Sequence, residues 1–128
     1  MSTIKQDIIE YLSEEGLRPQ DKEYGIHFKY HMLSLFIRWD EEDDHYLSIY
    51  LPGIFSSDEN NRGDVLEVIN QINLNHKVVK CLLVNDDVWV ATEQLLDSTP
   101  VFGDIIERTL DMLVQARDQF YEDLRNLS

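Results

Sequence analysis

Apolar and polar residues alternate with a period of two in three stretches between residues 26 and 51. This period is typical of strands with one buried face, because successive side chains of a strand point to opposite sides of the sheet. Short polar segments separate the stretches, which favours an antiparallel meander, and Pro52-Gly53 is expected to end its third strand. The apolar positions predict a core face made of Ile26, Phe28, Tyr30, Leu33, Leu35, Ile37, Trp39, Leu47, Ile49 and Leu51.

Two further segments carry apolar residues at the spacing of an α-helix. The first covers residues 3–15, and Ser2 and Thr3 are expected to cap its start. Gly16 is expected to end it, because glycine readily adopts the left-handed conformation that follows many helices. After the loop-like residues 56–64, the same spacing predicts a short helix that ends around residues 73–75.

The clearest helical segment covers residues 100–127 and follows Thr99-Pro100, a pair typical of a helix start. Its apolar arc spans roughly 200°, whereas one docking face needs only about 100°. We therefore expect this helix to contact two surfaces, namely the sheet and either another helix or a second subunit. The positions proposed for that second contact are Ile105, Met112, Val114 and Tyr121.

Between these last two helices, residues 78–84 and 87–92 predict a hairpin with its turn at Asn85-Asp86, since both residues tolerate positive φ. The predicted order is therefore α-β-β-β-α-β-β-α. This order predicts an α+β fold with a five-stranded antiparallel sheet and helices packed on it. A chain of 128 residues is close to the commonest domain size, so residues 1–128 are expected to form one domain.

The chain is strongly acidic, with 25 Asp and Glu against 11 Lys and Arg and a formal net charge of −14. A field of this sign repels nucleic-acid phosphates and anionic lipid headgroups, so we expect neither nucleic acid nor a membrane surface as a partner. The acidity is otherwise explained by solubility.

The only cysteine, Cys81, lies in an apolar run that reads as a buried strand. A buried thiol of this kind is expected to act as a small apolar side chain rather than as a nucleophile. The lack of a second cysteine, of an apparent signal peptide and of a long apolar segment favours the cytoplasm.

No pattern of catalytic, cofactor-binding or metal-binding residues is found. The run Asp40–Asp44 resembles an acidic turn more than a calcium loop, because adjacent carboxylates on a short connection point apart. His27 and His31 are four residues apart along a strand, or about 13 Å, which is too far to chelate one ion. We therefore expect no metal and no cofactor.

The second face of the meander combines His27, Lys29 and Ser34 with larger aromatic residues. Amphipathic aromatic side chains beside cations are typical of a docking surface for a protein partner. Cross-strand aromatic pairs that only stiffen the sheet would give the same pattern, and both interpretations stay open. The candidate partner-binding residues are Phe36, Arg38, Tyr46 and Tyr50.

The whole pattern resembles the YbjN family of sensory-transduction regulators, whose fold is like that of type III secretion chaperones. The matching segments are residues 25–30, the acidic turn before His45-Tyr46-Leu47, Val78-Val79-Lys80, Asp87-Val88-Trp89-Val90, and Asp97-Ser98-Thr99-Pro100 with the long helix. The chain departs from the pattern at His31-Met32, where such hairpins usually carry a glycine. The resemblance implies a non-enzymatic adaptor or chaperone-like protein, often a homodimer, and transfers no functional residues.

Two functions are therefore considered. The first is a non-enzymatic adaptor, regulator or chaperone-like protein that binds a protein partner through a sheet face or a helix. The alternative is a small-molecule-binding protein or an enzyme with a pocket between the sheet and the helices. That alternative requires polar groups inside an apolar cavity, and no polar residue interrupts the predicted core face.

Overall fold

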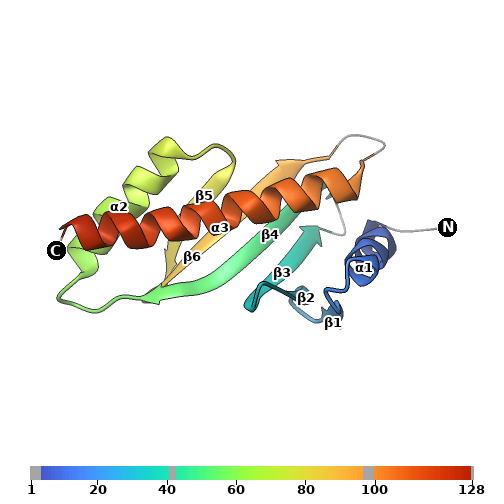
Figure 1. Cartoon of the computed structure of the whole chain (residues 1–128), viewed down its shortest axis with the longest axis horizontal. Helices are drawn as coiled ribbons and strands as arrows, with labels where there is room; N and C mark the ends of the chain where they lie inside the picture. Colours follow the sequence, from blue (N-terminus) through green and yellow to red (C-terminus); the bar gives the residue numbers. More distant parts are fainter. Residues whose placement is uncertain (1–3, 41–42, 97–99, 128) are drawn as a thin grey trace.

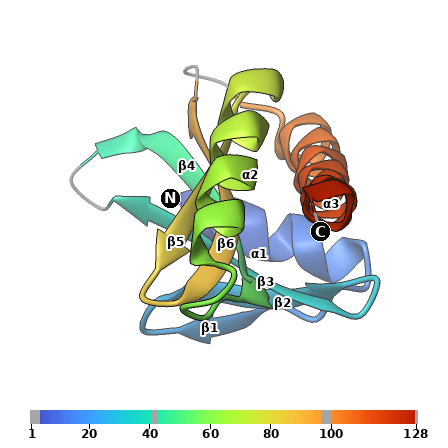
Figure 2. The same ribbon diagram turned by 90° about the vertical axis from the view of Figure 1, so that its left-hand side faces the viewer.

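The computed structural model describes residues 4–40, 43–96 and 100–127, which form three helices and six strands. A single curved sheet lies on one side and the three helices lie together on its other side (Figures 1 and 2). The elements in chain order are α1 (Ile4–Glu14), β1 (Gln20–Lys22), β2 (Gly25–Tyr30), β3 (Leu33–Asp40), β4 (Asp43–Ser56), α2 (Arg62–Asn75), β5 (Val79–Val84), β6 (Asp87–Leu95) and α3 (Phe102–Leu127).

The sheet is antiparallel throughout and its strand order is β1-β2-β3-β4-β6-β5. The α+β class and the antiparallel sheet agree with the prediction, but the number of strands does not. Strand β1 was not predicted from the sequence, and with it the observed order is α-β-β-β-β-α-β-β-α. The three residues of β1 are polar and exposed, and they therefore carry no alternation of apolar and polar positions.

Strand β4 continues through Pro52-Gly53, so the prediction that these residues end it was wrong. The register against β6 shifts between Leu51 and Phe55, and Gly53 there has a φ of 63°. A bulge of this kind takes up residues that cannot join the ladder, including a proline without a backbone N–H. The strand therefore bends instead of stopping.

Both short hairpins turn through residues other than glycine. His31 and Met32 connect β2 to β3 with φ values of 49° and 68°, and Asn85 connects β5 to β6 with a φ of 58°. Two successive positive φ values fit a type I′ turn, whose twist matches that of the flanking strands. His31-Met32 therefore adopts, without glycine, a turn conformation that two-residue hairpins favour.

Helix α1 ends as the sequence predicts. Gly16 has a φ of 75°, its N–H donates to Ser13 O, and the N–H of Leu17 donates to Leu12 O. These are the two hydrogen bonds of a Schellman motif, which satisfies carbonyls at a helix end. The predicted caps of α1, residues 2 and 3, lie outside the described residues.

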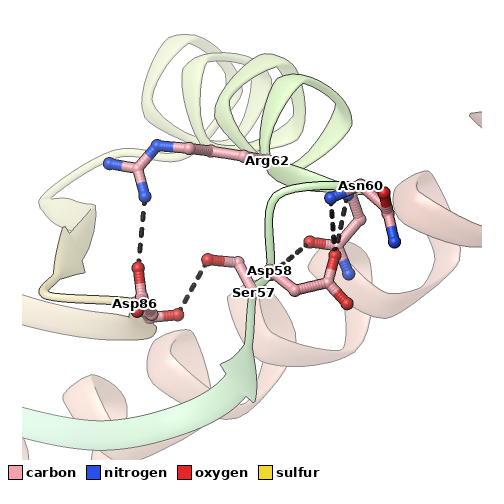
Figure 3. A network of polar contacts seen from close by, with 6 residues as sticks. Ser57, Asp58, Asn60, Arg62 and Asp86 are labelled. Atoms are coloured by element: carbon pink, nitrogen blue, oxygen red, sulfur yellow. Dashed lines mark hydrogen bonds and ion pairs between the residues drawn. The ribbon is translucent and has the colours of Figure 1, made fainter.

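Helix α2 begins at Arg62, earlier than expected, because polar contacts order the preceding loop (Figure 3). The backbone N–H groups of Asn60 and Asn61 donate to Asp58 Oδ1 at 2.9 and 3.0 Å. Ser57 Oγ donates to Asp86 O at 2.9 Å, and Arg62 forms an ion pair with the Asp86 carboxylate. The loop is thereby fixed to the β5–β6 turn.

Helix α3 begins at Phe102, so Pro100 precedes the helix and does not occupy its first turn. The predicted cap, Thr99, lies outside the described residues. Seven residues of α3 are buried, and all of them except Thr109 belong to one apolar core with residues of α1, α2 and the inner face of the sheet. Tyr11 of α1 lies against Gly103, and the C-terminal half of α3 runs beside α2 (Figure 1).

Candidate functional site

No described helix covers the side of the sheet that faces away from α1, α2 and α3, and we call it the open face (Figure 2). Residues that alternate with the buried core positions point to it, such as His27 between Ile26 and Phe28. The strand register aligns one row of this face across all six strands. This row is Gln20, His27, Phe36, Tyr50, Ala91 and Lys80.

Four aromatic side chains form a continuous cluster at the centre of the open face. Phe36 and Tyr50 stack with ring centroids 4.8 Å apart, and both meet Trp89 edge-on at 6.0 and 6.2 Å. Tyr24 meets Phe36 edge-on at 5.2 Å and is 50% exposed. We call these four residues the aromatic cluster. Offset and edge-to-face pairs are favourable aromatic geometries, so the cluster is a stiff, partly exposed surface.

The structure brings two of the candidate partner-binding residues into contact, Phe36 and Tyr50, and places the others nearby. Arg38 lies two residues beyond Phe36 on β3 and lines a hollow of about 410 Å³ together with Tyr24 and residues of β1. Tyr46 is 44% exposed and lies further along β4. All four candidates thus belong to the open face.

Trp89 and Tyr24 also belong to this surface, although neither was predicted from the sequence. Trp89 lies between the buried residues Val88 and Val90, so its alternation alone could have assigned it to the face opposite the core. It joins Phe36 and Tyr50 because β6 pairs with β4, although the two strands are far apart in the sequence.

The charges of the open face differ from those of the whole chain. By strand alternation, its described side chains include the cations Lys22, Lys29, Arg38 and Lys80 and the acids Asp87 and Glu93. Lys80 and Glu93 form an ion pair at 3.1 Å. Among the described side chains of this face, cations therefore outnumber acids, although the chain as a whole has a net charge of −14.

Contacts within the chain involve several residues of the wide apolar arc of α3. Ile105, Met112 and Tyr121 pack against the core, and the Tyr121 hydroxyl donates to Ile54 O. Val114 is half-buried and lines a hollow with Tyr30, His31 and Leu33 near the β2–β3 turn. Besides the sheet, α3 thus contacts the two other helices, α1 and α2.

The described residues offer little for catalysis. Among them, no group of three or more His, Cys, Asp or Glu side chains could hold a metal ion. Burial raises the pKa of the Cys81 thiol to about 12, so the thiol stays protonated and unreactive. Part of the run Asp40–Asp44, residues 41–42, lies outside the described residues. None of the described helices is both long and apolar enough to cross a membrane.

Comparison with known proteins identifies a family that covers almost the whole chain. The family model described as "YbjN: Putative bacterial sensory transduction regulator" matches residues 5–126. The comparison with curated proteins gave no match.

Two solved structures show the same fold. One is an uncharacterized protein from Methanothermobacter thermautotrophicus, with 16% identity, a TM-score of 0.67, and coverage of 96% of this chain and 98% of that chain. The other is YbjN from E. coli, described as a putative transcription regulator, with 12% identity, a TM-score of 0.60, and coverage of 96% and 92%.

Proposed function

Because the chain belongs to the YbjN family, we propose that it is a non-enzymatic regulator or adaptor that binds a protein partner with the open face of its sheet. The observation that carries the proposal is the aromatic cluster, which no described helix covers. Tyr and Trp are enriched at the energetic centres of protein interfaces, because they bury a large area and lose little conformational entropy.

The position of the cluster also supports a binding role. Three of its four rings come from the paired strands β3, β4 and β6, and Tyr24 lies in the short turn between β1 and β2. A rigid surface loses little entropy when a partner binds. The exposed side chain of Leu95, which is 72% accessible, and Tyr46 extend the apolar area beyond the cluster.

The alternative, a small-molecule pocket between sheet and helices, has less support. Buried apolar side chains from both layers fill that space in the described part of the chain. The surface hollows are lined largely by exposed residues, such as Lys22 and Glu23 in the hollow beside Arg38. A pocket for a small molecule normally encloses its ligand and combines an apolar lining with a few polar groups.

Phe36→Ser and Tyr50→Ser test the proposal, with Leu66→Ser as the matched control. Leu66 is an exposed apolar residue on α2, on the helical side of the molecule. Loss of a central aromatic anchor typically costs at least about 2 kcal/mol of binding, or roughly 30-fold in affinity. We therefore expect both variants to lose partners that wild type and Leu66→Ser capture from cytoplasmic extract, with unchanged circular dichroism. If both variants retain every partner, the aromatic cluster only stiffens the sheet.

A homodimer formed through α3 is a separate proposal, supported by its exposed Leu127 and half-buried Val114. Light scattering on the purified chain tests it directly. A monodisperse monomer at micromolar concentration contradicts this proposal, and it leaves the role of the open face unchanged.

A further inference from the structure

A second hollow lies at the β1–β2 edge of the sheet, between the end of α1 and the open-face residues of β1 and β2. Its volume is about 330 Å³, and it is lined by Gly16, Leu17, Arg18, Gln20, His27 and Lys29. Gln20 and His27 are direct partners in the β1–β2 ladder, and Lys29 follows His27 two residues along the same face. Arg18 precedes β1 with a φ of 49°. We call this hollow the basic hollow.

The lining of the basic hollow contains no carboxylate. Arg18 and Lys29 are exposed, and neither forms an ion pair with any residue that the structure describes. Other cations of the chain do find acids, for example Lys5 with Asp21 and Lys80 with Glu93. In a chain with more than twice as many acids as bases, two neighbouring cations without an acid leave a local site for an anion.

The basic hollow and the aromatic cluster are adjacent. His27 of the hollow is the direct ladder partner of Phe36 of the cluster. Neighbouring strands are about 4.8 Å apart, so the two features are separated by one strand spacing. A peptide segment that lies on the aromatic cluster therefore needs only one or two residues to reach the basic hollow.

We infer that the basic hollow binds a carboxylate of the protein partner, so that the recognised segment carries an aspartate or glutamate next to its apolar anchor residues. The inference rests on the proposed function and names the chemistry of its partner. A long polyanion such as nucleic acid is disfavoured, because it would extend over the acidic remainder of the surface. A single carboxylate interacts mainly with the hollow, since salt screens charges more than about 10 Å away.

Panning of a random dodecapeptide display library against the immobilised protein tests the inference. The baits are the wild type, the double variant Arg18→Ala/Lys29→Ala, and a control that removes two exposed cations elsewhere, Lys77→Ala/Arg108→Ala. We expect wild type and control to select peptides with Asp or Glu beside aromatic or aliphatic residues. Loss of two exposed ion pairs should lower the affinity of such a peptide for the hollow variant roughly 2- to 30-fold.

A fourth bait, Tyr50→Ser, separates the two proposals. Peptides that require Tyr50 but show no preference for acids would overturn the carboxylate inference and leave the proposed function intact. Peptides that bind equally with and without Tyr50 would overturn the proposed function. A library that yields no peptide dependent on Tyr50, Arg18 or Lys29 would overturn both.

Discussion

Replacing Asn73 tests how the outer edge of the sheet is held. The side-chain amide of Asn73, on α2, binds both backbone groups of Cys81 on the edge strand β5. Cys81 N–H donates to Asn73 Oδ1 at 2.7 Å, and Asn73 Nδ2 donates to Cys81 O at 2.9 Å. These backbone groups point away from β6, so the amide occupies the place that another strand would take.

We expect Asn73→Ala to lower the free energy of unfolding by about 1 to 2 kcal/mol relative to a control variant. Each net hydrogen bond contributes about 0.5 to 1.5 kcal/mol, and water can partly replace the amide at this edge. Alanine also gains several tenths of a kcal/mol of helix propensity, which would hide part of the loss. Asn75→Ala is the matched control, because Asn75 is exposed on the same helix and makes only a 3.5 Å contact with Gln71.

Urea unfolding followed by circular dichroism measures the difference, provided that both variants keep the same m-value. Amide hydrogen exchange gives a local measure, since only Asn73→Ala should speed exchange at Cys81. The N–H of Leu82 faces β6 by strand alternation and should stay protected in both variants. Two lost hydrogen bonds should cost at least about 1 kcal/mol. If the two variants unfold within about 0.3 kcal/mol of each other and Cys81 exchanges at the wild-type rate, the amide therefore does not hold this edge.

A glycine variant and a thiol-labelling experiment test the packing of the sheet. Gly25→Ala should destabilise the protein by roughly 2 kcal/mol or more, because its Cβ would lie 2.3 Å from Ile37 O at a φ of 143°. The control Gly63→Ala, with no atom within 4 Å of its Cβ, should be neutral or stabilising by thermal melting, and equal effects would contradict this reasoning. Cys81 should react with a disulfide reagent at pH 8 far more slowly in the folded state than in urea, because burial raises its pKa to about 12. Equal labelling rates in the folded and the urea-unfolded state would refute the burial effect. The free energy of unfolding should also fall above about pH 9, because only the unfolded chain releases the thiol proton there.

The alternation between residues 26 and 51 was sufficient to predict β2, β3 and the first part of β4, with the core residues on the correct face except for Trp39, whose side chain lies outside the described part of the structure. The sequence was also sufficient to predict the end of α1, because the left-handed conformation of Gly16 is a local preference of the chain. Strand β1 was missed because its polar residues gain their hydrogen bonds from β2, and no local pattern encodes that pairing. The bulge at Gly53 was also missed, since pairing with β6 on both sides of it keeps β4 extended.

The candidate site was predicted only in part, because the alternation within a strand is local whereas the pairing of distant strands is not. Alternation assigned Phe36 and Tyr50 to one face, because the side-chain period of a strand is a local property. The contact of these two rings with Trp89 depends on the pairing of β4 with β6. Strand β6 begins 30 or more residues after β4 ends.

The sequence by itself therefore determined the elements, their buried faces and the presence of an aromatic surface. The tertiary structure decided which residues complete that surface and where its cations lie. The basic hollow forms only when the end of α1 and strand β1 lie beside β2. Long-range pairing of this kind follows from the burial of the whole core, which no short window of sequence contains.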